Sequence, residues 1–372
     1  MEEHRQALLA AGSRAHALAR RTQARLSRYE EAREWMAASR GAICYYGLNQ
    51  PARVVQMRGL QDAAHSLGIA FELVFVGAEA QLEALAERYD ELLVFVSLDL
   101  LPAMALLTRS ARSRALLHAP CYGRGGDIPR GCRQITEAQI HSLEESRELI
   151  GFVVTDFSDA GNQRYYPGYA TEHGIPVLSF PWGVNVARHF PVLTDMQADV
   201  VFLGTYFEKG PRIDAFLTPI LKRHRHTIVG TGWSESPFGV GDTMLSDFNA
   251  AAPLLYSSHA VSLNIHHDWE TEGYTCNERA FNSVACGGFP VSDNAPRIFD
   301  FFSADEYVVA GEPDEYAATV AHYVDRPGDR EAVMARAQSR VFAEHTYHHR
   351  LSDLLLCVFG QDTDRPYCPL FV

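Results

Sequence analysis

The chain has 372 residues, enough for two domains of ordinary size, and 47% of them are hydrophobic, enough for two buried cores. Its formal net charge of −13 argues against permanent binding to a nucleic-acid backbone or an anionic membrane, although a local basic patch is compatible with it. The seven cysteines form no C-x-x-C pair, and no signal peptide or membrane-spanning apolar run is visible. We therefore expect a cytoplasmic protein with reduced thiols and no transmembrane segment.

Residues 1–40 are rich in Ala, Leu, Arg and Glu and contain no proline, which predicts a helical arm. Five arginines between positions 14 and 28 make this segment locally basic. Two interpretations stay open. The arm is either solvated or packed on the body of the protein, or it docks on a partner or a membrane surface.

Residues 41–190 alternate apolar runs with helical patterns, which predicts a Rossmann-like domain. The runs at 71–77 and 91–97 are continuously apolar, as are strands of a parallel sheet that is covered on both faces. A helix is expected at 53–67 between the first two strands. The other expected strands are 42–46, 115–120, 151–158 and one or more within 175–185.

His118 is expected at the carboxyl end of the strand at 115–120, the edge at which open α/β sheets bind ligands. The glycines of the following loop, at 121–127, do not match G-x-G-x-x-G, so a dinucleotide-binding fingerprint is unsupported there. We interpret this loop as flexible. His118 is interpreted either as a structurally satisfied histidine or as a functional one.

A linker is expected at about 186–198, and a second α/β half begins with the strand at 199–205. Lys209 and Arg212 follow that strand, either in an exposed basic loop or in a ligand site. The other expected strands are 226–233, 261–265 and 306–310, and the expected helices are 253–259, 297–302, 313–324, 329–344 and 351–359.

The second half is organised around residues 264–293, where a strand end, a polar loop, a short helix, a Gly-Gly turn and another strand follow one another. The helix places Ala280, Phe281, Val284 and Ala285 on one apolar face. Unpaired N–H groups and the helix dipole favour phosphate where a polar loop enters a helix beside strand ends. We therefore expect an anionic ligand at this position.

Two motifs in this stretch, N-E-R-x-F at 277–281 and A-C-G-G-F at 285–289, are followed by Asp293. Together they resemble the C-terminal signature of the glycosyltransferase group-1 superfamily. The most similar branch is the one named for the spore maturation protein CgeB. The resemblance implies an α/β protein of GT-B fold, in which two Rossmann-like, doubly wound domains face a cleft and a nucleotide-sugar lies in the C-terminal one.

This fold implies four parts for the chain. A helical arm at 1–40 precedes an N-terminal, acceptor-side domain at 41–190. The nucleotide-sugar domain follows at 198–345. The helix and tail at 346–372 are expected to cross back to the N-terminal domain.

The resemblance also implies a donor site without a bound metal, in which Lys, Arg and helix N-termini neutralise the leaving diphosphate. Arg279 and Lys209 are the electrostatic candidates, with Arg212 in reserve; for Arg279 the alternative is an ion pair with Glu278 or another local carboxylate. His118 is a candidate base or orienting group on the acceptor side. The catalytic candidates are His118, Glu272 and Arg279. The donor-binding candidates are Gly204, Lys209, Arg212, Gly232, Trp233, Asn277, Glu278 and Asn282.

One departure from the family concerns stereochemistry. Retaining members usually have glutamates at the positions that Tyr274 and Asn282 occupy here. Asn282 can still hydrogen-bond a ribose hydroxyl, because an amide both donates and accepts. Glu272, two residues out of register, could supply a carboxylate if the loop is shifted. Retention is therefore a weak preference that comes from the resemblance.

Several histidines invite a metal-site interpretation, but no cysteine or carboxylate completes an obvious ligand set beside them. The only Asp-x-Asp, at 362–364, lies in the C-terminal tail. We expect neither a metal nor another cofactor. The histidines in question are His224, His226, His266, His267, His345, His348 and His349.

The leading hypothesis is a hexosyltransferase-type glycosyltransferase that moves a sugar from a UDP- or GDP-sugar to an unknown acceptor. The acceptor could be a small molecule, a glycan or a protein, whereas the acidic chain disfavours nucleic acid. A sugar-nucleotide epimerase of the same fold is one alternative. A non-catalytic GT-B protein that binds a nucleotide-sugar or a partner is another, because the glutamate pair is missing. Assembly as a homodimer stays open.

Overall fold

A computed structural model describes residues 41–109, 114–118, 122–123, 133–158, 161–162, 175–206, 209–243, 248–272 and 275–359. The helical arm predicted at 1–40, most of the loop at 121–127 and the tail beyond residue 359 lie outside the described residues. Two compact units make up the described chain. The N-terminal unit consists of residues 41–181 and 347–359, and the C-terminal unit consists of residues 182–346.

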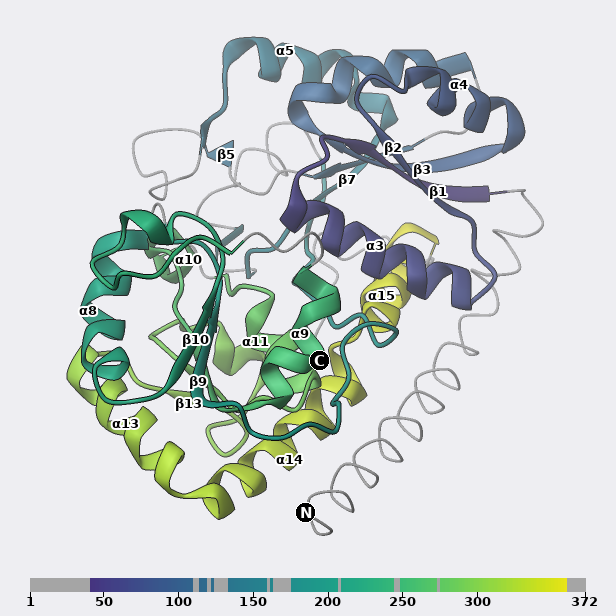
Figure 1. Cartoon of the computed structure of the whole chain (residues 1–372). Coiled ribbons are helices and arrows are strands. Elements are labelled where there is room, and N and C mark those ends of the chain that lie inside the picture. The colour runs from purple at the N-terminus through teal and green to yellow at the C-terminus, as the bar shows by residue number, and fades with distance from the viewer. Residues whose placement is uncertain are drawn as a thin grey trace. The chain divides into compact units, whose positions relative to one another are not determined.

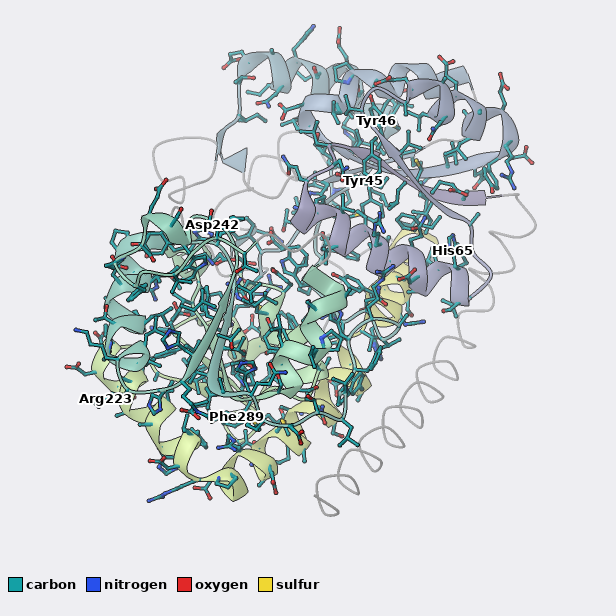
Figure 2. All side chains as sticks on the ribbon, in the orientation of Figure 1. Tyr45, Tyr46, His65, Arg223, Asp242 and Phe289 are labelled. Carbon is teal, nitrogen blue, oxygen red and sulfur yellow. The ribbon has the colours of Figure 1, made fainter. Side chains whose placement is uncertain are left out.

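The N-terminal unit is built on a six-stranded sheet in the order β2-β1-β3-β4-β7-β8, whose strand pairs are all parallel (Figure 1). Every residue of β1 is buried, because helices cover both faces of the sheet. Tyr45 and Tyr46 point to opposite faces of it, as neighbours on a strand must (Figure 2). The strands are β1 (Gly41–Gly47), β2 (Phe71–Phe75), β3 (Glu91–Ser97), β4 (Arg114–His118), β7 (Ile150–Thr155) and β8 (Val177–Ser179).

Helix α15 (Tyr347–Phe359), the last described element, packs against α3 (Pro51–Ser66) of the same unit (Figure 1). Leu351 is fully buried in a core shared with α3. Gly59 permits this close approach, because a Cβ there would overlap the Tyr347 ring. The other elements of the unit are α4 (Glu79–Arg88), η2 (Leu98–Arg109), β5 (Tyr122–Gly123), β6 (Arg133–Gln134), α5 (Glu137–Glu145) and η3 (Arg147–Leu149).

The C-terminal unit is built on a five-stranded parallel sheet in the order β10-β9-β11-β12-β13. Its strands are β9 (Ala198–Leu203), β10 (His226–Val229), β11 (His259–Asn264), β12 (Pro290–Ser292) and β13 (Val308–Val309). Its helices are α8 (Gly210–Leu221), η5 (Trp233–Glu235), α9 (Phe248–Ser257), α10 (Asp268–Glu272), α11 (Arg279–Ala285), α12 (Ile298–Phe301), α13 (Pro313–Asp325) and α14 (Pro327–Glu344).

Alternation along β9 divides the core of this unit between the two faces of the sheet. Val200 and Phe202 pack under α8 and α13, whereas Val201 and Leu203 pack under α9. Figure 1 shows α8 and α13 on one side of the sheet and α9 and α11 on the other. Figure 2 shows Phe289 within this unit, where it is 2% exposed.

The predicted fold class, an α/β chain with two Rossmann-like domains, is confirmed, and several element bounds differ from the prediction. Helix α9 begins at Phe248, five residues earlier than expected, and residue 259 already belongs to β11. A short helix, α10, occupies part of the expected polar loop. Strand β10 ends at Val229, because Gly230 and Gly232 have positive φ angles of 154° and 80° and turn the chain. The last helix begins at Tyr347, four residues earlier than expected. No described helix is long and apolar enough to cross a membrane.

Candidate functional site

Charged side chains gather where the central strands of the C-terminal unit end. Parallel pairing places Asn264 of β11 beside Ser292 of β12, and β9 lies on the other side of β11. The loops that follow these strands therefore leave the sheet at one edge, where α/β sheets bind ligands. The side chains described below come from these loops and from the first turn of α11.

Arg279, the first residue of α11, is fixed against the strand ends by hydrogen bonds to neutral acceptors. Its Nη2 donates to the Ile265 carbonyl at 3.0 Å, its Nη1 to the Leu203 carbonyl at 3.3 Å, and its Nε to Asn264 Oδ1 at 3.1 Å. The side chain is 9% exposed, and it forms no ion pair with a described carboxylate, Glu278 included. A buried positive charge is therefore held at the edge of the sheet.

Lys209, just before α8, supplies a second cation to the same place. Its Nζ donates to the Ile265 carbonyl at 3.2 Å, so Lys209 and Arg279 share one acceptor oxygen. Burial, and then the positive charge of Arg279, lower the pKa of Lys209 to about 8. Two cations so close together repel each other, and an anion bound beside them would relieve that repulsion.

Glu270 contributes a buried carboxylate to the cluster. Its Oε2 accepts a hydrogen bond of 2.6 Å from the backbone N–H of His267. Burial alone would raise the pKa of Glu270, but Lys209 and the neighbouring histidines hold it below its usual range. Burial, together with Lys209, lowers the pKa of His267 to about 4, so that imidazole is neutral at pH 7.

Asp293, the residue after β12, binds three donors. Its Oδ2 accepts from the His266 backbone N–H at 3.0 Å and from Arg212 Nε at 2.9 Å, and its Oδ1 lies 2.6 Å from His266 Nδ1. Burial opposes ionisation, but these neighbours keep the pKa of Asp293 below its usual range. Arg212 therefore serves as a partner of this carboxylate.

A chain of amides lies beside Arg279. Asn264 Oδ1 accepts from Asn277 Nδ2 at 2.9 Å as well as from Arg279, and Asn264 Nδ2 donates to Ser292 Oγ at 3.3 Å. Because Asn277 donates to Asn264 through Nδ2, its Oδ1 remains available to accept a hydrogen bond. Asn277 Oδ1 and Asn282 Oδ1 are both buried and have no hydrogen-bond donor among the described residues. Both atoms could accept a hydrogen bond from a ligand hydroxyl.

Gly204 and the glycine turn after β10 shape the edge of the sheet. A Cβ on Gly204 would lie 3.0 Å from Arg279 Nη1, and a Cβ on Gly230 would overlap the Gly204 carbonyl. The indole of Trp233 is fully buried, and its Nε1 donates to the Gly204 carbonyl at 2.8 Å. Trp233 therefore supports the loop after β9 through the Gly204 carbonyl, and Gly232 directly precedes Trp233 in the turn.

The structure brings most of the predicted donor-site residues together in the C-terminal unit. Glu278 is half-buried at the start of α11, and the side chain of Glu272 is not among those described. The sequence pattern named His266 only among the histidines of a metal-site interpretation, and it gave Glu270 no role. Their signal was position, because both follow β11 at the edge where parallel strands end.

His118 lies in the N-terminal unit, at the end of β4. Its Nε2 contacts Arg53 Nη1, and a guanidinium only donates, so this nitrogen accepts the hydrogen bond. Burial, and then the charge of Arg53, lower the pKa of His118 well below its usual range. The imidazole is therefore neutral, and its basic nitrogen is engaged by Arg53.

Comparison with known proteins gives one family match and a set of similar solved structures. Residues 212–356 match the family described as Glycosyl transferase-like. No curated protein sequence matches the chain significantly.

Similar solved structures cover nearly the whole fold. HepE of Anabaena in complex with UDP and glucose gives a TM-score of 0.57 at 10% identity, over 84% of this chain and 98% of that one. BGT of phage T4 with its UDP-glucose substrate gives 0.56 at 11% identity, over 86% and 99%. Sucrose-phosphate synthase of Thermosynechococcus elongatus gives 0.56 at 10% identity, over 84% and 97%.

At these identities the structural similarity establishes the fold, which is GT-B. The family match covers part of the C-terminal site, including Arg212, Arg279 and Asp293, and begins just after Lys209. The family match and the fold together support a glycosyltransferase.

Proposed function

We propose that this protein transfers a sugar from a nucleoside-diphosphate sugar, with UDP or GDP as the carrier, to an acceptor, and that it does so without a metal ion. The bond between the sugar C1 and the diphosphate breaks, a bond from C1 to an acceptor oxygen forms, and the acceptor loses its proton. We place the chain in the CgeB-like branch, on its N-E-R-x-F and A-C-G-G-F motifs.

The observation that supports this proposal most strongly is the meeting of Lys209 and Arg279 at the Ile265 carbonyl. Both groups are nearly buried, and charge-assisted hydrogen bonds to phosphate are strong in such surroundings. A leaving diphosphate needs this kind of stabilisation, because negative charge develops on it as the bond to C1 breaks. UDP or a UDP-sugar is bound in the similar structures of HepE and BGT.

Metal independence follows in this proposal from the same pair of cations, which would neutralise the diphosphate themselves. One structure of BGT contains UDP and Mn2+, so this part of the proposal needs its own measurement. We expect donor turnover in EDTA to equal turnover after addition of Mn2+. A large gain with Mn2+ would reject metal independence and leave the transfer reaction standing.

The unpaired acceptors Asn277 Oδ1 and Asn282 Oδ1 would hold ribose or sugar hydroxyls, and Glu278 would assist them. Glu272 would supply a carboxylate near the sugar, and retention of configuration is the preferred outcome. His118 would act on the acceptor side as an orienting group. The acceptor is a small molecule, a glycan or a protein, and the site of action is the cytoplasm.

Thermal shift with UDP, GDP, ADP and dTDP tests the donor site. A ligand at about 100 times its Kd adds about 2.7 kcal/mol of stability, which is readily measured. We expect one diphosphate to stabilise the wild type, and we expect Lys209→Ala and Arg279→Ala to abolish the shift while remaining folded. Arg223→Ala is the matched control, because Arg223 is an exposed arginine of the same unit, away from the site (Figure 2).

Product analysis then separates the chemistries. A glycoside of an added acceptor, or slow donor hydrolysis to a free sugar of unchanged identity, supports transfer. An epimerised sugar would point to an epimerase of the same fold. Binding without turnover, whatever acceptor is offered, would favour a non-catalytic nucleotide-sugar-binding protein.

A further inference from the structure

A buried His-Asp pair lies at the edge of the donor site without a role in the proposal above. His266 and Asp293 are both fully buried, and they come from adjacent strand ends, two residues after β11 and one after β12. His266 Nδ1 lies 2.6 Å from Asp293 Oδ1, and Asp293 Oδ2 also accepts a hydrogen bond of 3.0 Å from the His266 backbone N–H. This double contact fixes both the position and the rotation of the imidazole.

The partners of the imidazole determine where its hydrogen lies. An ionised carboxylate only accepts hydrogen bonds, so Nδ1 of His266 carries the hydrogen that points to Asp293. Asp293 stays ionised because Arg212 Nε also donates to it, at 2.9 Å. Asp293 therefore orients the imidazole through Nδ1, and Nε2 is the ring nitrogen that remains for a ligand contact.

Nε2 of His266 has no hydrogen-bond partner among the described residues, although the whole side chain is buried. A buried polar atom that lacks a partner costs about 1–3 kcal/mol, so folded proteins keep such atoms rarely, and a bound ligand is one way of supplying the partner. The neighbouring residue along the chain is Ile265, whose carbonyl anchors both Lys209 and Arg279. The unpaired nitrogen therefore belongs to the residue that directly follows the anchor of the two cations proposed to bind the diphosphate.

We propose that His266 is a further ligand-contacting residue, whose Nε2 donates a hydrogen bond to a phosphate oxygen of the donor while Asp293 orients the ring. The inference rests on the proposed function and deepens it. With a hydrogen on each ring nitrogen, the imidazole donates to Asp293 through Nδ1 and to the phosphate through Nε2, and the Asp293 carboxylate balances its charge. Lys209, Arg279 and His266 then form three donors around one anion.

Two substitutions separate ligand contact from a purely structural role. In His266→Asn, the amide nitrogen takes the approximate place of Nδ1. The hydrogen bond to Asp293 is therefore kept, whereas the donor at the position of Nε2 is lost. In His266→Gln, the amide nitrogen takes the approximate place of Nε2. The donor at that position is therefore kept, whereas the hydrogen bond to Asp293 is lost. His322→Asn is the matched control, because His322 pairs with Asp329 at 3.3 Å on the surface of the same unit.

The experiment measures the binding of UDP and of uridine to the wild type and these variants, by calorimetry and by ligand NMR, after thermal melts have shown that each variant is folded. We expect His266→Asn to raise the Kd for UDP about tenfold or more and to leave that for uridine unchanged. We expect His266→Gln to bind UDP more tightly than His266→Asn, and His322→Asn to match the wild type. If His266→Gln does not fold, the comparison of UDP with uridine in His266→Asn still decides.

Wild-type affinity for UDP in His266→Asn would overturn the role of Nε2 and leave the Lys209 and Arg279 site intact. Equal loss of UDP and uridine would overturn it as well, because only a structural role weakens both ligands alike. A wild-type protein that binds no UDP would overturn the inference together with a UDP donor site.

Discussion

Replacement of Lys209 by methionine should stabilise the free protein while it weakens donor binding. Lys209 has a pKa of about 8 in the folded chain instead of 10.5, and a shift of this size corresponds to about 3 kcal/mol. That free energy opposes folding at neutral pH, because a charged ammonium is buried beside Arg279. Methionine has a similar length and no charge, and it loses one hydrogen bond to the Ile265 carbonyl, worth about 1 kcal/mol. The expected net gain in the free energy of unfolding is therefore about 1–3 kcal/mol.

The pH dependence of stability has a defined sign. Below pH 8 the folded and the unfolded chain both hold the Lys209 proton, so this residue makes stability independent of pH there. Between pH 8 and 10.5 the unfolded chain binds more protons than the folded chain, so the free energy of unfolding rises with pH. Lys209→Met should remove this rise.

Urea unfolding at pH 7 and pH 9.5, with and without UDP, tests the prediction, and Lys222→Met is the control because Lys222 is exposed. We expect Lys209→Met to be more stable than the wild type at pH 7 without ligand, and to gain little from UDP. In the wild type, UDP affinity should fall above pH 8, by up to about tenfold per pH unit. A variant that is clearly less stable without ligand, or that binds UDP normally, would refute the reasoning.

Three further predictions concern packing and charge. Gly59→Ala should lower the free energy of unfolding by about 1–3 kcal/mol through overpacking against the Tyr347 ring, and Tyr347→Ala in the same chain should recover part of the loss, as measured in urea. Gly230→Ala should weaken UDP binding, measured by thermal shift, because its Cβ would collide with a backbone carbonyl. Asn264→Asp should weaken UDP binding about tenfold in calorimetry, because a carboxylate at 3.1 Å would neutralise Arg279.

The sequence by itself determined the fold class and most of the elements. Continuous apolar runs, such as residues 91–97, are dictated by burial on both faces of a parallel sheet, and β3 occupies Glu91–Ser97 as predicted. The apolar face of α11 was also readable, because its i, i+4 spacing is local, and all four predicted residues are buried. Hydrophobic periodicity and composition are therefore enough to predict features that depend on neighbours along the chain.

Only the tertiary structure determined which residues of the site contact one another. Lys209 and Arg279 are 70 positions apart in the sequence, and no local pattern indicates that both donate to the Ile265 carbonyl. In the sequence, His266 is one of several histidines of a metal-site interpretation, and Asp293 is a residue that follows the two motifs. Only the parallel register of β11 and β12 brings their side chains into contact. Which strand ends become neighbours depends on sheet order, and sheet order is set by the packing of the whole unit, so these contacts lie beyond what spacing along the chain can predict.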